Sequence, residues 1–178
     1  AHVVFGVILG TGVGGGIVVD GGLLKGPNAV AGEWGHTPLP YLRADPYTGA
    51  EENAVDDRPC YCGRQNCVEA FLSGRGLAQT HRELTGERLR ADEIDAFGPG
   101  ADLYATMLSR ALAQIVNILD PDMIVLGGGL SNLDGLAGRV SERLIRYGFS
   151  HEGGTTVAVA EHGDSSGVLG AARLWPNG

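Results

Sequence analysis

Three cysteines within eight residues are the feature of this sequence that points most directly to chemistry. Cys60, Cys62 and Cys67 have the spacing of thiolates that share one tetrahedral metal ion, with one ligand position left over. His36 is the best candidate for that position, because we expect His81 on an exposed helix and the other histidines outside the loop that the cysteines close. Three buried free thiols are the alternative. An odd number of closely spaced cysteines is a poor disulfide framework, which favours a reduced, cytoplasmic protein.

A glycine run, residues 10–16 (GTGVGGG), offers a different chemistry. It formally matches the dinucleotide-binding fingerprint, but that motif requires a helix to follow, and residues 17–19 (IVV) favour a strand. No Gly-Lys-Ser/Thr follows either, so the run is not a Walker A loop. Exposed backbone N–H groups at such a turn bind phosphate oxygens, and Thr11 adds a hydroxyl donor. A plain glycine hairpin is the alternative.

Two further glycine-flanked segments carry candidate binding residues. In residues 32–36 (GEWGH), Glu33 and His36 stand three apart, where a carboxylate and an imidazole can face one pocket and accept hydrogen bonds from sugar hydroxyls. In residues 124–132 (IVLGGGLSN), three glycines follow an apolar strand, and α/β sheets bind ligands at such strand ends. An ordinary loop and a tight strand–helix turn are the respective alternatives.

A histidine, an aspartate and two serines lie together in residues 162–167 (HGDSSG). They are too close in sequence to orient one another as a hydrolase triad, and the chain has no Gly-x-Ser-x-Gly elbow. Ser165 or Ser166 instead suits the N-cap of a final helix. A zinc hydrolase is also disfavoured, because three cysteines and a histidine leave no open metal position.

The apolar pattern predicts the elements that must position these residues. Residues 3–9 form a continuous apolar run typical of a buried strand, and a glycine turn to residues 16–20 predicts an antiparallel hairpin. Residues 26–68 lack a period and contain an acidic stretch, 43–58, that we expect to be exposed. The remaining predictions are strands over 23–24, 122–126 and 155–160, and helices over 74–86, 101–119, 133–147 and 166–174. This order indicates one α/β domain with a mixed sheet.

Composition excludes several classes of protein. The net charge of -8 argues against a nucleic-acid-binding surface. The 30 glycines follow no fixed period, which excludes a collagen-like chain. No run of 18 apolar residues is present, so no membrane span is expected, and the first strand lacks the basic region of a signal peptide. The chain starts at the edge of that strand, which suggests a fragment of a longer protein.

Taken together, the motifs resemble those of the ROK family of sugar kinases and sugar-responsive repressors. The glycine hairpin, the GEWGH segment, the block from Cys60 to Glu69 (CYCGRQNCVE) and the strand end LGGG occur in the family's order along essentially the whole chain. The cysteine block is the most specific of these. Asn66 stands where the family often has glycine, and asparagine tolerates the left-handed backbone expected there.

The resemblance implies an RNase-H-like, actin/hexokinase-type lobe with a mixed sheet and flanking helices. Residues 1–178 would be the C-terminal lobe, with the zinc- and sugar-binding segment within 26–73. The resemblance also implies roles for individual residues: a structural Zn²⁺ on His36, Cys60, Cys62 and Cys67; sugar hydroxyls on Glu33, His36 and Glu69; ATP on Thr11, Gly12, Gly127, Gly128 and Gly129.

Within the family, the sequence looks most like bacterial fructokinases and mannokinases, and next like N-acetylglucosamine kinases. Four stretches carry this likeness: AGEWGHTPLPY, PCYCGRQNCVEAFLSG, NILDPDMIVLGGGLSN and HGDSSGVLGAARLWP. The resemblance therefore implies that the full-length protein is a homodimer that uses ATP and Mg²⁺ to phosphorylate a hexose, with fructose 6-phosphate as the expected product. The family's catalytic aspartate and first phosphate loop are absent, so no catalytic residue is expected in this chain and the chain alone is expected to be inactive. An N-acetylglucosamine kinase, a glucokinase and a ROK repressor with an added DNA-binding domain are the alternatives.

Overall fold

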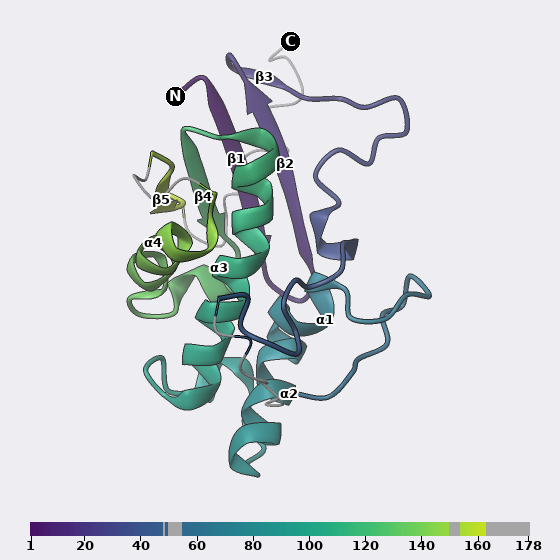
Figure 1. Cartoon of the computed structure of the whole chain (residues 1–178), viewed down its shortest axis with the longest axis vertical. Helices are drawn as coiled ribbons and strands as arrows, with labels where there is room; N and C mark the ends of the chain where they lie inside the picture. Colours follow the sequence, from purple (N-terminus) through teal and green to yellow (C-terminus); the bar gives the residue numbers. More distant parts are fainter. Residues whose placement is uncertain (48, 50–54, 150–153, 163–178) are drawn as a thin grey trace.

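The computed structural model describes residues 1–47, 49, 55–149 and 154–162. Its centre is a five-stranded mixed sheet with the strand order β3-β2-β1-β4-β5. The antiparallel pairs are β1 with β2 and β2 with β3, whereas β1 with β4 and β4 with β5 are parallel (Figure 1). The strands are β1 (Val3–Leu9), β2 (Val13–Val19), β3 (Gly22–Leu23), β4 (Met123–Gly127) and β5 (Thr156–Val159).

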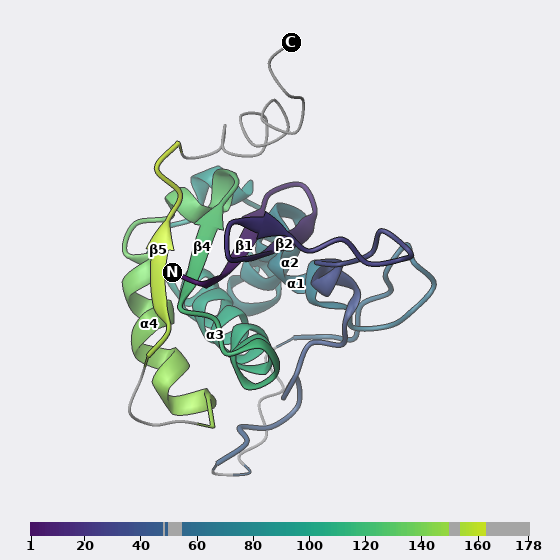
Figure 2. The ribbon, with the colours of Figure 1, turned by 90° about the horizontal axis from the view of Figure 1, so that it is seen from above.

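Helices cover one face of this sheet. Figure 2 shows α3 and α4 side by side beneath the strands, and α1 and α2 continue this layer beyond the sheet. The side chains of Phe5, Val7 and Leu9 alternate along β1 into the core between sheet and helices. The helices are α1 (Val68–Leu72), α2 (Gly74–Thr85), α3 (Pro99–Leu119) and α4 (Leu136–Tyr147). The α/β class with a mixed sheet and flanking helices is therefore confirmed.

The helix boundaries follow local signals in the sequence. The Ser73 hydroxyl caps α2 by accepting the Gly76 N–H, and Gly86 ends this helix in the left-handed conformation. Pro99 occupies the first turn of α3, and Asp120 ends that helix before Pro121. The short helix α1 was not predicted. The helix expected over 166–174 lies outside the described residues.

The hairpin differs from its prediction in where β2 begins. We expected the strand to begin at Gly16, but β2 starts at Val13, so Gly14 and Gly15 also lie in the strand. The reason is close packing: a Cβ at Gly15 would lie 2.8 Å from the Gly6 carbonyl oxygen and 3.1 Å from the Trp34 ring. The strand therefore needs glycine for its neighbours to approach.

Two predictions of exposure are wrong. The acidic stretch 43–58 contains buried residues, because Asp45 pairs with Arg110 of α3 and Arg146 of α4, while Arg58 enters the core. His81 is also buried, with 6% of its surface exposed, because α2 packs on α3 and places its ring beside Gly100.

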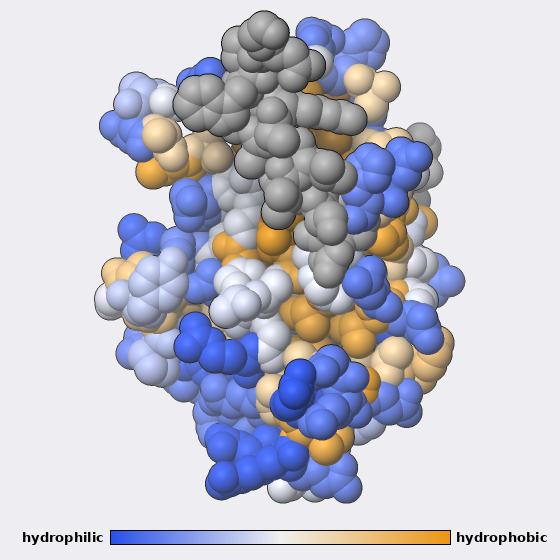
Figure 3. Space-filling model, turned by 180° about the vertical axis from the view of Figure 1, so that it is seen from behind, coloured by the Kyte–Doolittle hydropathy of each residue, from blue (hydrophilic) through white to orange (hydrophobic). Residues whose placement is uncertain are grey.

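The apolar run of β1 is not buried on both sides by the described residues. Ile8 is 40% exposed and Val159 of β5 is 45% exposed. Seen from behind, the molecule shows apolar surface in its middle (Figure 3). The run predicted the strand correctly, and only its alternate residues face the helix layer.

Candidate functional site

A short 3₁₀ turn, Trp34–His36, positions the first candidate ligand. The turn lies directly on β2: the Trp34 indole donates a hydrogen bond of 2.8 Å to the Gly14 carbonyl, and Gly35 sits against the Val13 backbone. A glycine at position 32, with φ of +96°, lets the chain enter the turn within contact of Gly15. The glycines of strand and loop thus bring His36 to the end of the sheet.

A compact knuckle positions the cysteines. Isolated β-bridges join Pro59 to Gln65 and Pro38 to Cys67, so the knuckle closes on itself and is tied to the segment after His36. Gly63 has a φ of +88° and Asn66 a φ of +57°, which confirms the left-handed backbone expected at Asn66. The Asn66 side chain accepts a hydrogen bond from the Arg58 N–H and donates one to the Asp57 carboxylate, which ties the end of the knuckle to the residues before it.

The four predicted metal ligands meet at one point. Their ligand atoms, from His36, Cys60, Cys62 and Cys67, all lie within 4.8 Å of one another. His36 Nδ1 is 3.5 Å from Cys60 Sγ, and the Sγ atoms of Cys62 and Cys67 are 3.6 Å apart. Tetrahedral zinc with bonds near 2.3 Å requires ligand separations of about 3.7 Å. Geometry and donor chemistry therefore both fit a structural zinc ion.

The thiols of this cluster differ in their protonation. Burial, reinforced by hydrogen bonds from the other two thiols, raises the pKa of Cys67 to about 12. A backbone hydrogen bond from Arg64 lowers the pKa of Cys62. Cys67 is therefore a neutral thiol in the metal-free protein, and a zinc ion would have to displace its proton.

The second nitrogen of His36 also has a partner. Nε2 lies 2.9 Å from the Tyr61 hydroxyl, and the two rings meet edge to face. Tyr61 is 79% exposed, so it can turn away without disturbing the core. Glu33, the other residue expected near a sugar here, is exposed and directly precedes the turn.

Glu69, the third residue expected to contact sugar, belongs to the first turn of α1. Its carboxylate accepts a 2.8 Å hydrogen bond from the Val13 N–H and lies against Gly12, where a Cβ would be 2.8 Å from the carboxylate oxygen. It lines a cavity of about 310 Å³, the Glu69 cavity. The other residues of this cavity include Arg58, Cys60, Tyr61, Ser73, Arg75 and Gln79.

A second cavity lies where a nucleotide was expected. This Thr11 cavity, of about 580 Å³, joins Thr11 of the β1–β2 turn to Gly129 at the end of β4. Two other expected residues pack against β1 instead: Gly127 lies in β4, and Gly128, with φ of +81°, approaches the Leu9 backbone. Residues not foreseen also line the cavity: Gly10, Gly74, Arg75, Ala91, Asp92, Leu130, Asn132 and Leu133.

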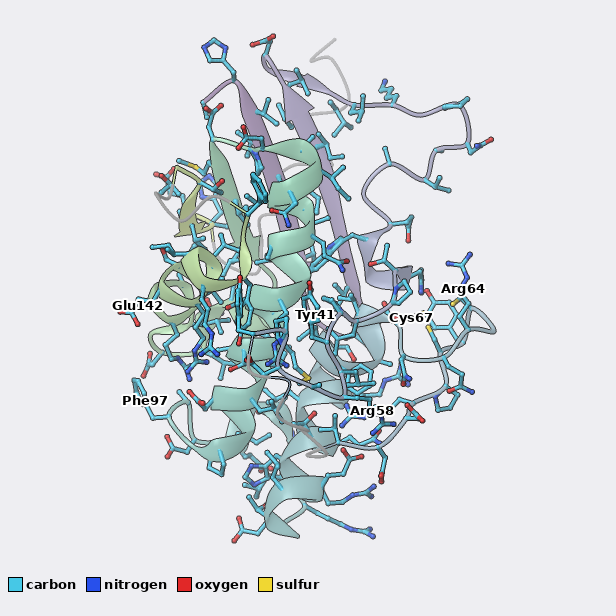
Figure 4. The ribbon with its side chains drawn as sticks, in the orientation of Figure 1. Tyr41, Arg58, Arg64, Cys67, Phe97 and Glu142 are labelled. Carbon is cyan, nitrogen blue, oxygen red and sulfur yellow. The ribbon has the colours of Figure 1, made fainter. Side chains whose placement is uncertain are left out.

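Arg58 supports the site structurally, a role that the sequence analysis did not predict. Its guanidinium is buried over the Phe71 ring, and it pairs with Glu83 at 2.7 Å. It also donates hydrogen bonds to the carbonyls of Ala70 and Gly76. Figure 4 shows Arg58 beside the helices and Cys67 farther out, so Arg58 anchors the knuckle to α1 and α2.

No helix among the described residues is both long and apolar enough to cross a membrane.

The chain is similar to several sugar kinases of known sequence or structure. An N-acetyl-D-glucosamine kinase of Salmonella paratyphi B is 38% identical over 96% of this chain and 58% of its own length. The crystal structure of a ROK hexokinase from Thermus thermophilus matches 96% of this chain and 56% of its own, with a TM-score of 0.75 and 28% identity. A ROK glucokinase from Streptomyces griseus, in complex with glucose and AMPPNP, matches 99% of this chain and 61% of its own, with a TM-score of 0.76 and 26% identity.

These relatives correct one expectation from the sequence. The resemblance to fructokinases and mannokinases rested on short stretches, whereas the relatives described above, which align over nearly the whole chain, are an N-acetylglucosamine kinase, a hexokinase and a glucokinase. The chain spans less than two thirds of the length of these relatives. The ROK family model matches residues 1–177, and the chain belongs to the ROK family.

Proposed function

We propose that the protein phosphorylates an amino sugar or hexose with ATP, and that N-acetylglucosamine is its substrate. One observation carries this proposal: the β1–β2 turn lines one cavity and touches a carboxylate that lines the other. Gly12 lies against the carboxylate of Glu69, and Thr11 lines the larger cavity. A phosphate-binding turn between a carboxylate and a nucleotide-sized space suits phosphoryl transfer from ATP to a hydroxyl. The 38% identity to an N-acetylglucosamine kinase supports this substrate over fructose.

In this proposal Glu33, His36 and Glu69 accept hydrogen bonds from sugar hydroxyls. Zinc, held by His36 and the three cysteines, would supply no reaction chemistry, since a closed site of this kind is structural. His36 uses one nitrogen for the metal, and a sugar hydroxyl would replace Tyr61 at the other.

The nucleotide side of the proposal uses backbone groups. Thr11 and Gly12 donate to the ATP phosphates, and Gly129 borders the adenosine, while Gly127 and Gly128 hold the end of β4 against β1. Bound Mg²⁺ would neutralise charge on the phosphates. The sugar hydroxyl attacks the γ-phosphorus and ADP leaves with the electrons of the broken P–O bond.

We assign the general base for the hydroxyl proton to no residue of this chain. The chain covers 58% of its N-acetylglucosamine kinase relative, and we propose that residues 1–178 are the C-terminal lobe of a longer kinase. A second lobe would supply the base, and domain closure would exclude water. The isolated chain is therefore expected to be inactive; a homodimer in the cytoplasm remains a prediction.

A coupled ADP-release assay on the full-length protein tests the function. N-acetylglucosamine, glucose, fructose and mannose are supplied separately with ATP and Mg²⁺, and N-acetylglucosamine is expected to give the highest kcat/KM. Glu69→Gln keeps the size of the side chain and is expected to lower kcat/KM. Sugar binding without turnover by zinc-loaded, folded protein would reject the kinase and favour a sugar-responsive repressor.

A further inference from the structure

One side chain, Arg75, is shared by the two cavities. It lines the Glu69 cavity together with Ser73 and the Thr11 cavity together with Gly74. Its place is fixed by the start of α2, because the Gly74 N–H donates a 2.8 Å hydrogen bond to the Gly10 carbonyl of the β1–β2 turn. Arg75 therefore stands beside the turn that separates the proposed sugar from the proposed nucleotide.

The other charges of these cavities are already engaged. Arg58 is paired with Glu83, the Glu69 carboxylate accepts the Val13 N–H, and Asp92 forms a two-pronged pair with Arg90. Within the described ranges, by contrast, the side chain of Arg75 makes neither a hydrogen bond nor an ion pair, and it is exposed to solvent. Arg75 is therefore the charged side chain that lines both cavities and has no hydrogen-bond or ion-pair partner among the described residues.

This position also gives Arg75 no structural benefit. It is the second residue of α2, where the partial positive charge of the helix end disfavours a cation. An arginine at a helix N-terminus that has no anionic partner in the protein is stabilised when an anionic ligand binds to it. Phosphate is the anion that arrives between a sugar and a nucleotide during phosphoryl transfer, and the planar guanidinium matches its oxygens.

We propose that Arg75 binds the transferred phosphoryl group, as the γ-phosphate of ATP before the reaction and as the sugar phosphate after it. This inference rests on the proposed function and adds a cation to it. The Arg75 guanidinium donates hydrogen bonds to phosphate oxygens at the junction of the cavities, on the side of the turn where Thr11 and Gly12 donate theirs. It makes no contact with the sugar ring or the adenosine.

Affinity ratios in the full-length protein test this role. Calorimetry gives the dissociation constants of N-acetylglucosamine, its 6-phosphate, ADP–Mg²⁺ and ATP–Mg²⁺ for the wild type, Arg75→Gln and Arg75→Lys. In Arg75→Gln the preference for sugar phosphate over sugar, and for ATP over ADP, should fall by about tenfold to a hundredfold, as for a lost charged hydrogen bond. Arg75→Lys should retain part of each preference, because lysine keeps the charge and loses the paired donors.

Arg82→Gln is the matched control, since Arg82 is an exposed arginine two turns along α2 that lines neither cavity. Zinc content and the unfolding temperature confirm that each variant is folded. The inference would be overturned if Arg75→Gln and Arg82→Gln showed the same preference for sugar phosphate over sugar and the same preference for ATP over ADP. If the wild type turns over normally in that case, the proposed function stays intact. A folded wild type that binds neither sugar nor nucleotide would overturn both.

Discussion

Replacing Gly35 with alanine tests how the metal site is positioned. Gly35 is buried in the 3₁₀ turn directly before His36, and an added Cβ would lie 2.1 Å from the carbonyl oxygen of Val13 in β2. Real contacts of this kind stay above 3.0 Å, so the turn and the strand must separate by about 1 Å. Both partners are backbone, so no side-chain rotation can relieve the clash.

The size of the effect follows from this displacement. Overpacking of this kind costs about 1–3 kcal/mol, and a clash between two backbones belongs at the upper end. A loss of about 3 kcal/mol lowers the melting temperature of a chain this long by roughly 6–12 °C. A ligand bond to zinc tolerates errors of about 0.2 Å, so His36 should also lose its place in the metal site.

Zinc content after dialysis against a chelator, together with thermal unfolding, measures both effects. Gly14→Ala is the control, because Gly14 lies in the same strand and its added Cβ meets nothing within 4 Å. Gly35→Ala should retain much less zinc than Gly14→Ala and unfold at a lower temperature. Equal zinc retention and equal melting temperatures would refute the reasoning, because they would show that the turn does not depend on its contact with β2.

Three further predictions concern the same fold. Arg58→Met leaves the partly buried Glu83 without its cation and should cost about 3 kcal/mol in urea unfolding, whereas adding Glu83→Leu should recover part of the loss. An additive double mutant would contradict the pairing. Zinc affinity, measured by competition with a chelator, should rise by about tenfold or more per pH unit from pH 6 to 8, because the raised pKa of Cys67 means that zinc must displace its proton; a flat profile would contradict this. The hydrogen bond from the Val3 N–H lowers the pKa of Asp122. The stabilisation from this carboxylate is therefore present above the ordinary carboxyl pKa and is lost as the pH falls through the lowered value. Asp122→Asn should flatten this acid limb of the curve of stability against pH, and an unchanged limb would contradict the role of Asp122.

Local signals explain which parts of the fold were predictable. The ends of α2 and α3 follow from Ser73, Gly86, Pro99 and Asp120, each of which acts within a few residues of its own position. The metal site was predictable for a similar reason, since three of its four ligands lie within one knuckle and its chemistry depends on residue type. His36 was found by elimination, although one of the eliminated residues, His81, is not exposed as assumed.

The buried charges were not predictable because their partners are distant in the sequence. Asp45 is held by Arg110 and Arg146, and Arg58 by Glu83, so the stretch between residues 43 and 58 is charged in composition but anchored at both ends. Composition correctly indicated charge there and wrongly indicated exposure, since burial of a charge depends on the partner that tertiary folding supplies. The same limit applies to Arg75, whose importance appears only when two cavities are seen to share it.

The glycine run illustrates how one motif serves two purposes. As a sequence it suggested phosphate binding throughout, but only Gly10 and Thr11 line the Thr11 cavity, and Gly12 contacts the carboxylate of Glu69. Farther along β2, Val13 and Gly15 receive the backbone of Gly35 and Gly32, and this contact carries His36 to the cysteines. The strand therefore connects the turn that we propose to bind phosphate directly to the segment that carries His36. A change that shifts this segment should alter the position of Glu69, whose carboxylate accepts a hydrogen bond from Val13, even though none of the four metal ligands lines the Thr11 cavity. Loss of zinc should thus weaken sugar binding more than nucleotide binding, because Thr11 and Gly129 are held by the sheet itself.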